Sequence, residues 1–296
     1  MPGIYSASSD DITRDYLDSL LIESRLIDSD LPTLSTTLYG KTFATPIMTA
    51  ALSHLHAICD NAMCEIAAAA KEVGALHWYG MGTDEELEQI VATGADTVKI
   101  IKPHADDREV FRRIEHAAKT GVFAMGMDID HAFSWDGKYD CCMGLDMRPK
   151  SFEQIKSYVE ASPVPFIIKG CLSVSDAEKC AKAGVKGILL SHHHGIMNYM
   201  VPPMMMISEI RKAVGPDMPI FVDCGIVSGM DAFKTLALGA DAVCVGRAFM
   251  DPLKNGRAGV IEKYKEMNGQ LATAMARTGS KSPAEIDPSV IHHRNF

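Results

Sequence analysis

The chain has 296 residues, enough for two average domains or one large barrel, and 47% of them are hydrophobic. The formal net charge of −9 comes without a basic cluster, which excludes a nucleic-acid-binding face, and no apolar run approaches the roughly 20 residues of a membrane span. Nothing at the N-terminus resembles a signal peptide, so we expect a cytoplasmic protein that binds neither nucleic acid nor membranes. Its eight cysteines include no CxxC pair, which predicts reduced, mostly buried thiols.

Taken in chain order, residues 11–35 are expected to form a helical cover and an extended link. Eight short apolar runs follow, each of the unalternating kind that suits a strand buried on both faces of a parallel sheet. The predicted strands are Pro46–Ala51, Ala75–Tyr79, Thr97–Ile101, Val122–Met127, Pro165–Ile168, Gly187–Leu190, Pro219–Val222 and Ala242–Val245.

Helical patterns separate these strands, and most of them begin near a capping Thr, Ser or Asp and end at a glycine. Strands that alternate with helices eight times predict one α/β domain over residues 1–296. Its fold is a (β/α)8 TIM barrel with an N-terminal helical cover and a C-terminal closing helix. The predicted helices are Asn61–Val73, Asp84–Ala92, Asp106–Lys119, Phe152–Ala161, Val174–Ala183, Ile207–Val214, Met230–Leu238 and the closing helix Gly256–Gly279.

Two neighbouring strand ends carry small residues, and the loops after strand ends are where a parallel barrel places its chemistry. Asp223 and Gly225 follow one strand, and Gly246 and Arg247 follow the next. Glycine lets the main chain approach an anion and the arginine adds positive charge, so this pair of ends predicts a phosphate seat. It suits a single monophosphate, because no GxGxxG motif lies between a strand and a helix to hold a pyrophosphate.

Lysine and histidine mark two further strand ends. Lys169 closes the apolar strand FIIK, where it can reach into the barrel mouth. Three histidines follow the next strand, and alternation along an extended segment would point His193 one way and His192 and His194 the other. A lone histidine acting as acid or base is favoured over a metal site, because no Cys, His, Asp or Glu cluster with a supporting spacing lies nearby.

Five segments carry a family likeness: TLYGKTFATPIM, FIIKG, GILLSHHHGI, IFVDCGIVSGMDAFKTLALGADAVCVGRAFM and GVIEKYKEMNGQLATAMARTG. In these segments the chain resembles the FMN-dependent α-hydroxy-acid oxidases and dehydrogenases, the family of glycolate oxidase and lactate oxidase. The resemblance runs in the same order from about Thr36 to Gly279 and is most specific from Pro165 to Met250. It implies an FMN flavoprotein oxidoreductase with a small-molecule substrate, assembled as a homo-oligomer, either a tetramer or an octamer.

The resemblance also implies roles for single residues. Lys169 matches the lysine at the flavin N1/O2 edge, His193 matches the active-site histidine, and Asp223 matches the aspartate that holds the ribityl chain. Backbone contacts to the phosphate fall on the two glycine turns, and the stretch after the first strand lies beneath the flavin ring. The positions matched to cofactor contacts are Ala50, Ala51, Leu52, Lys169, Ser191, Asp223, Gly225, Gly246 and Arg247.

The residues that bind the substrate in the family pattern differ in this chain. The arginine that grips the substrate carboxylate three residues after the histidine is Ile196 here, and a second such arginine has no counterpart in the short loop DIDHAFSWDGKYDCC. A carboxylate without a guanidinium partner loses two charge-assisted hydrogen bonds. We therefore expect glycolate and L-lactate to be poor substrates compared with a larger or less acidic hydroxy or carbonyl compound, held near Lys102, Trp135 and Ile196.

Two functions from different classes follow. In the first, an FMN-dependent oxidoreductase, His193 takes a proton from a hydroxyl group, a hydride passes to flavin N5, and Lys169 stabilises the charge that develops. The second is a non-redox phosphate-binding TIM barrel, either an isomerase or lyase of a phosphorylated substrate or a degenerate binding protein. The resemblance implies the first function, the missing arginines add weight to the second, and flavin absorption in the purified protein would distinguish the two.

Overall fold

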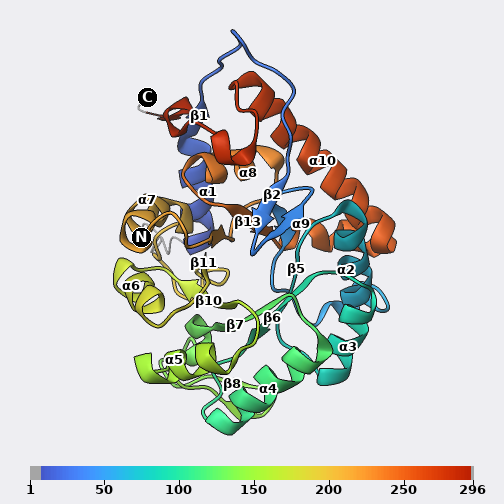
Figure 1. Ribbon diagram of the computed structural model, residues 1–296, viewed down its shortest axis with the longest axis vertical. Coiled ribbons are helices and arrows are strands. Elements are labelled where there is room, and N and C mark those ends of the chain that lie inside the picture. The colour runs from blue at the N-terminus through green and yellow to red at the C-terminus, as the bar shows by residue number, and fades with distance from the viewer. Residues whose placement is uncertain (1–7, 295–296) are drawn as a thin grey trace, which may run out of the picture.

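A parallel sheet of eight strands forms the centre of the computed structural model, which describes residues 8–294 (Figure 1). The strands pair in the order β4-β13-β12-β11-β10-β7-β6-β5. A bridge from Leu52 to Tyr79 and a 2.9 Å hydrogen bond from the Gly80 N–H to the Leu52 carbonyl join the two ends of this order. The predicted barrel is therefore confirmed, with strands β4 (Ile47–Thr49), β5 (His77–Tyr79), β6 (Thr97–Ile101), β7 (Ala124–Asp128), β10 (Phe166–Cys171), β11 (Gly187–Leu190), β12 (Ile220–Val222) and β13 (Ala242–Val245).

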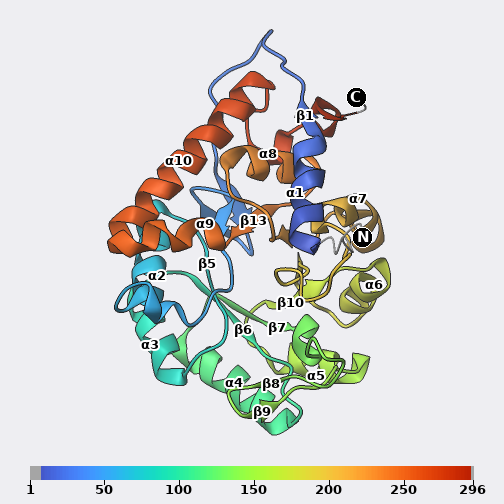
Figure 2. The same cartoon turned by 180° about the vertical axis from the view of Figure 1, so that it is seen from behind.

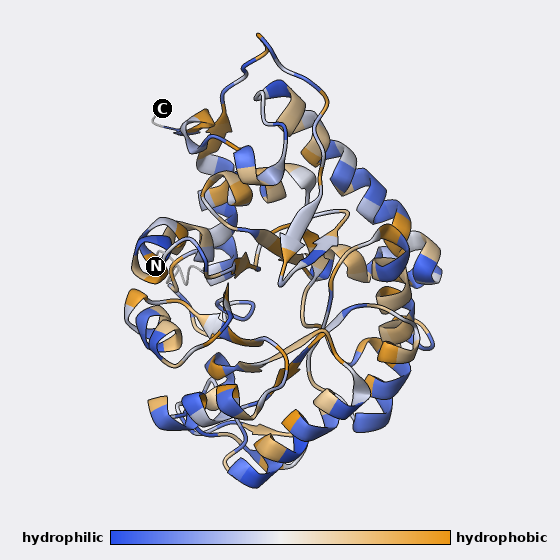
Figure 3. Cartoon of the chain, viewed as in Figure 1, coloured by the Kyte–Doolittle hydropathy of each residue, from blue (hydrophilic) through white to orange (hydrophobic). Residues whose placement is uncertain are grey.

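Helices surround the barrel, and hydrophobic and hydrophilic residues alternate along them (Figure 3). In α4 an apolar stripe consists of Val110, Ile114 and Ala117, spaced at helical periodicity and fully or almost fully buried. Helix α7 begins four residues earlier than predicted because Pro203 occupies its first turn, where proline is tolerated. The surrounding helices are α2 (Ala62–Val73), α3 (Asp84–Ala92), α4 (Asp107–Thr120), α5 (Phe152–Ala161), α6 (Val174–Lys182), α7 (Pro203–Val214), α8 (Gly229–Ala237) and α10 (Gly256–Arg277), with a short α9 (Arg247–Met250) before the last.

The barrel interior is filled by side chains and is closed at its amino-terminal end by a hairpin. Trp78 and Phe221 meet in the interior with ring centroids 5.0 Å apart. The hairpin of β2 (Thr36–Leu38) and β3 (Lys41–Phe43) contributes Leu38 and Phe43 to the same cluster. The interior is thus a packed core, and the open end lies where the strands finish.

The N-terminal cover is the helix α1 (Ser9–Ser19), which the view from behind shows beside α8 (Figure 2). It buries Thr13 and Leu17, and an ion pair of 2.9 Å joins Arg14 to Asp231 of α8. The chain then continues through β1 (Leu20–Ile22), which pairs antiparallel with β14 (Ile291–His293). The prediction of a cover and an extended link is confirmed, although the helix begins two residues earlier than the expected segment.

The loop between β7 and α5 folds over the end of β6. It contains the 3-10 turn Ile129–Ala132 and the hairpin of β8 (Cys141–Cys142) and β9 (Leu145–Asp146). Two backbone hydrogen bonds fix the hairpin to the β6 loop, from Ala105 N–H to the Asp146 carbonyl (2.7 Å) and from Arg148 N–H to the Pro103 carbonyl (2.9 Å). The hairpin therefore covers the part of the barrel opening that lies at the end of β6.

All eight cysteines are free thiols, and five of them are buried, as the sequence predicts. Within residues 8–294, no helix combines the length and the apolar character that crossing a bilayer requires.

Candidate active site

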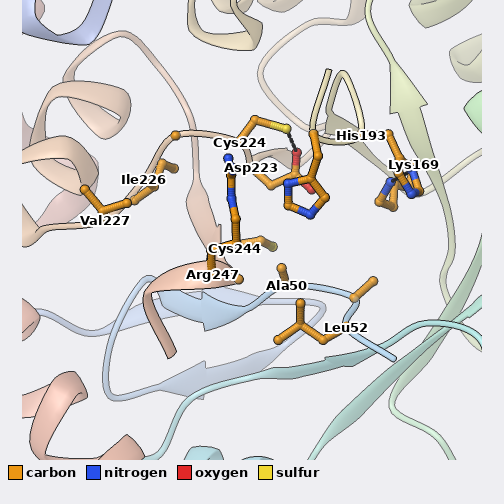
Figure 4. Close-up of a pocket in the computed structure, with 14 residues that line it drawn as sticks. Ala50, Leu52, Lys169, His193, Asp223, Cys224, Ile226, Val227, Cys244 and Arg247 are labelled. Carbon is orange, nitrogen blue, oxygen red and sulfur yellow. Dashed lines mark hydrogen bonds between the residues drawn. The ribbon is translucent and has the colours of Figure 1, made fainter. Parts of the chain in front are cut away.

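A hollow opens at the carboxyl ends of β4, β10, β11, β12 and β13 (Figure 4). It brings together eight of the nine positions matched to cofactor contacts. The ninth, Ser191, lies buried outside the lining, where its hydroxyl accepts the His193 N–H at 3.1 Å. The lining consists of Ala50, Ala51, Leu52, Lys169, His193, His194, Asp223, Cys224, Gly225, Ile226, Val227, Cys244, Gly246 and Arg247.

One end of the hollow presents unpaired main-chain donors. The backbone N–H groups of Gly225, Ile226 and Gly246 donate no hydrogen bond to any residue in 8–294. Gly225 has a φ of +75°, in the left-handed region that favours glycine. A Cβ on Gly246 would lie 3.4 Å from both Ala50 and Leu52, in ordinary contact with the floor of the hollow. Convergent donors of this kind form a seat for an anion.

The cover helix α1 borders this anion seat. Asp10 pairs with Arg247 at 2.7 Å, and the Arg14 guanidinium donates to the Gly225 carbonyl at 3.3 Å. The other carboxylate oxygen of Asp10 is buried and has no partner within the described part of the chain. Asp10 and Arg14 were missed from the sequence, because nothing in the cover's helical pattern indicates which strand end it will reach.

The other end of the hollow is charged. Lys169 Nζ lies 3.0 Å from Asp128 Oδ1, and Lys102 Nζ lies 2.6 Å from Asp128 Oδ2, so one buried carboxylate bridges two buried ammonium groups. Burial raises the pKa of Asp128, but the two lysine charges outweigh burial and hold that pKa well below its usual value. Burial likewise lowers the pKa of Lys169, and the charges of Asp128, Asp130 and Asp223 more than reverse that effect. Lys169 is therefore a fixed cation.

His193 stands beside this ion-paired group. Its Nδ1 lies 2.9 Å from Asp130 Oδ1 and 3.0 Å from Lys169 Nζ. Burial and the Lys169 charge lower the pKa of His193, but the carboxylates of Asp128 and Asp130 outweigh them and raise it. A proton on Nδ1, donated to Asp130, leaves the lone pair of Nε2 free, and His193 lines the hollow.

A family model described as FMN-dependent dehydrogenase matches residues 6–151 and 145–293. The chain belongs to the family of FMN-dependent dehydrogenases. It is 35% identical to an L-lactate oxidase of Roseobacter sp. over 53% of this chain and 43% of that protein. It is 37% identical to a peroxisomal (S)-2-hydroxy-acid oxidase of Oryza sativa subsp. japonica over 47% of this chain and 38% of that protein. The matches thus span less than half the length of these two relatives.

A solved structure of a mandelate oxidase variant with a monooxide FMN adduct superimposes with a TM-score of 0.88 at 26% sequence identity, covering 98% of this chain and 92% of that one. Structure and sequence comparisons therefore agree on an FMN-dependent barrel family, as the sequence resemblance predicted.

Two of the three adjacent histidines depart from the alternation expected along a strand. His193 and His194 both line the hollow, because each has a left-handed φ, of +50° and +57°, so the segment turns instead of extending. His192 is fully buried and faces the cover: it accepts the Gly195 N–H on Nδ1 at 2.9 Å and lies 2.8 Å from the Thr13 hydroxyl through Nε2. The predicted pairing of His192 with His194 is wrong.

The expectation that no ligand cluster lies near the histidines is also wrong. Asp128, Asp130 and His193 come within 4.8 Å of one another through their ligand atoms. Lys169 Nζ contacts all three, at 3.0, 3.6 and 3.0 Å, so an ammonium group already supplies the cation there. A second cluster, His131, Asp140 and Cys142, gathers in the β7–α5 loop as a hydrogen-bonded group.

Neither Ile196 nor Trp135 reaches the hollow. Trp135 is 91% exposed, because its loop folds over the end of β6 instead of over the hollow. Ile196 lies beyond the histidine turn, where its N–H bonds to the His192 carbonyl at 3.2 Å. Lys102 lies close to the site, but its ammonium group forms an ion pair with Asp128. The structure thus does not assemble the three predicted substrate residues in one place.

Asp128 and Asp130 are two further site residues that sequence reasoning missed. Asp128 directly follows the predicted strand Val122–Met127, which is the position where a parallel barrel places functional side chains. That signal could have identified Asp128. Asp130 reaches His193 only through the turn that follows β7, and no spacing in the sequence indicates this contact.

Proposed function

We propose that the hollow binds FMN and that the chain oxidises a hydroxy-acid-like substrate there, with His193 as the base. The observation that carries this proposal is the different chemistry of the two ends of one hollow. Unpaired backbone donors lie at one end, and the Lys169–His193 group lies at the other. A monophosphate suits the first end and a redox-active ring suits the second. Membership of the FMN-dependent family supports this function over a non-redox barrel that acts on phosphorylated compounds.

The phosphate end fits FMN in charge and space. The free N–H groups of Gly225, Ile226 and Gly246 would bind the phosphate, with Arg247 beside them. Figure 4 shows Arg247 extending toward Asp223 and Cys224. Its pair with Asp10 uses one guanidinium nitrogen and leaves other donors for a phosphate.

The remaining length of the hollow fits the rest of the cofactor. Asp223 makes no ion pair within residues 8–294, and only the Cys224 thiol donates to it, at 3.0 Å, so it can accept from the ribityl hydroxyls. The small residues Ala50 and Ala51 would lie against the ring, with Lys169 at its edge. FMN, when bound, supplies the two-electron acceptor.

His193 would then accept the proton of the substrate hydroxyl, and Lys169 would provide positive charge beside the ring. His193 Nε2 takes the proton from the substrate hydroxyl, and Asp130 and Asp128 stabilise the imidazolium that results. Lys169, which stays protonated across the working pH range, would supply a positive charge beside the ring. Both groups are buried or half-buried, so these interactions are screened less than at a surface.

The substrate end of the hollow lacks the guanidinium that a small hydroxy acid needs. Arg247 is the one arginine in its lining, and it lies at the anion seat. We therefore propose that glycolate and L-lactate react poorly and that a larger or less acidic hydroxy compound is preferred.

The test of this function is the absorption spectrum. Purified protein, or protein incubated with FMN and then desalted, should be yellow, and heating should release FMN in a ratio near one per chain. Protein that stays colourless and takes up no FMN would instead support the non-redox barrel.

Assembly and compartment belong to the same proposal. The β7–α5 loop exposes five large hydrophobic side chains, as an interface would: Phe133 (51%), Trp135 (91%), Tyr139 (52%), Met143 (54%) and Leu145 (39%). We propose a cytoplasmic homo-oligomer, a tetramer or octamer, and light scattering behind a sizing column measures its mass. A monomer at micromolar concentration would contradict it.

A further inference from the structure

A buried lysine outside the proposed active site has no counter-ion. The side chain of Lys99 lies on the helix side of β6, since its neighbours Val98 and Ile100 belong to the barrel interior and alternate residues of a strand face opposite ways. Lys99 is 4% exposed. Its ammonium donates to the Gly80 carbonyl and lies 3.8 Å from the centre of the Tyr79 ring.

No carboxylate within residues 8–294 lies in ion-pair range of Lys99. The carboxylates whose charges act on Lys99 are engaged elsewhere: Glu86 accepts the Tyr79 hydroxyl, and Asp84 pairs with Arg112. An ammonium group has three donors, and the carbonyl of Gly80 takes one of them. Burying a charge without a partner is costly, so this lysine either loses its proton or binds an anion.

A small pocket meets the Lys99 side chain beneath the β8–β9 hairpin, and we call it the basic pocket. Its polar lining is Lys99, Lys102, His104 and Arg113, and it contains no carboxylate. The thioether side chains of Met81 and Met143 also line it. The pocket has room for about one water-sized group.

Unused donors point to what fills the basic pocket. His104 is buried, and its Nδ1 has no hydrogen-bond partner within the described residues. The two terminal nitrogens of Arg113 likewise make no hydrogen bond within residues 8–294. Lys102 shares Asp128 with Lys169, and Arg113 shares Glu109 with Arg112, so each has a carboxylate partner. Lys99 is the cation of this pocket that has no such partner within residues 8–294.

We propose that the basic pocket binds one monovalent anion of the size of chloride. One uncompensated positive charge calls for one negative charge, and the space admits a single-atom ion but not a carboxylic acid. The donors of Lys99, His104 and Arg113 then gain an acceptor. The pKa of Lys99, which burial and the Arg113 charge lower to about 7, agrees with a cation that lacks its partner. This site is separate from the FMN hollow and does not depend on its function.

The test compares thermal unfolding in sodium chloride or bromide with unfolding in sodium gluconate at the same ionic strength and pH 6, because gluconate is too large for the pocket. The halides should raise Tm with saturation at millimolar concentration. Lys99→Met should abolish that increment. Lys71→Met is the matched control, since Lys71 also donates to a glycine carbonyl, that of Gly94, but is exposed. It should respond as the parent does.

An identical halide response in the parent and in Lys99→Met, or no response in the parent, would overturn the proposal. A second measurement uses the unaltered protein, in case Lys99→Met fails to fold. Crystals soaked in bromide should show anomalous scattering between Lys99 and Arg113, and a pocket that holds only water there contradicts an anion site.

Discussion

At the scale of single residues, the site depends on how two neighbouring carboxylates differ. Asp128 forms ion pairs with two lysines and stays ionised. Burial and the adjacent Asp128 charge raise the pKa of Asp130, so Asp130 is the member of the pair that takes up a proton first. Because Asp130 contacts His193 Nδ1 at 2.9 Å, it sets the proton affinity of the proposed base.

Asp130→Asn should move the acid limb of the pH–rate profile to lower pH. A base works in its neutral form, so activity falls as pH drops through the raised pKa of His193. Removing the Asp130 charge takes away one of the contacts that raise this pKa, and we expect a shift of roughly one unit. Asp146→Asn, on the exposed β9, is the control and should leave the profile unmoved. If the acid limb of Asp130→Asn is not shifted, Asp130 does not set the pKa of His193.

Several site residues could be predicted from the sequence, for a physical reason. Lys169, Asp223 and Gly246 lie at or just after the ends of apolar runs, and parallel strands bring those ends to one edge. Trp135 and Ile196 were misplaced, because a loop's path depends on contacts such as the bond from Ala105 to Asp146, which no local pattern encodes.

At the scale of elements, fully buried apolar strands were predictable, and the short, partly exposed paired strands were not. The eight barrel strands are buried whichever neighbour they take, so composition alone marks them. The β2–β3 and β8–β9 hairpins and the β1–β14 pair have strands of two or three residues, too short to show any periodicity. The β1–β14 pair also joins segments at opposite ends of the chain, so only the folded barrel brings its strands together.

The turns after β12 and β13 form the proposed phosphate end, and Arg247 links the second turn to helix α1, which borders it. Arg247→Ala should lower FMN affinity by at least about tenfold, because a charge-assisted contact to phosphate contributes about 1.5–3 kcal/mol. Fluorescence titration of the apoprotein measures this. Arg257→Ala, an exposed arginine of α10, is the matched control. Equal affinity in Arg247→Ala and the parent would place the phosphate elsewhere.

At the scale of the whole molecule, Lys99 links stability to pH. The pKa of Lys99 is lowered to about 7 by burial and by Arg113, with Glu86 and Asp84 opposing, so the unfolded chain holds more protons than the folded one between pH 7 and about 10.5. Stability therefore rises with pH through that window, and the cost of the buried charge is fully present below pH 7.

In gluconate, without halide, Lys99→Met should unfold at a higher temperature than the parent at pH 6. The gain should exceed about 2 °C, the shift expected for roughly 1 kcal/mol in a large domain. The difference should shrink as pH rises toward 10. A difference that is constant with pH would contradict a titrating Lys99.

The measurement that bears most directly on the proposed function is anaerobic mixing of FMN-loaded protein with a panel of 2-hydroxy acids while flavin absorbance is followed. We predict that a hydroxy acid with a large apolar side chain bleaches the flavin faster than glycolate or L-lactate does. His193→Ala should retain FMN but lose roughly two to four orders of magnitude in that rate. Rapid, saturable bleaching by lactate would overturn the substrate proposal alone. Flavin that dithionite bleaches but no hydroxy compound does, or a His193→Ala rate equal to the parent's, would contradict the proposed oxidoreductase.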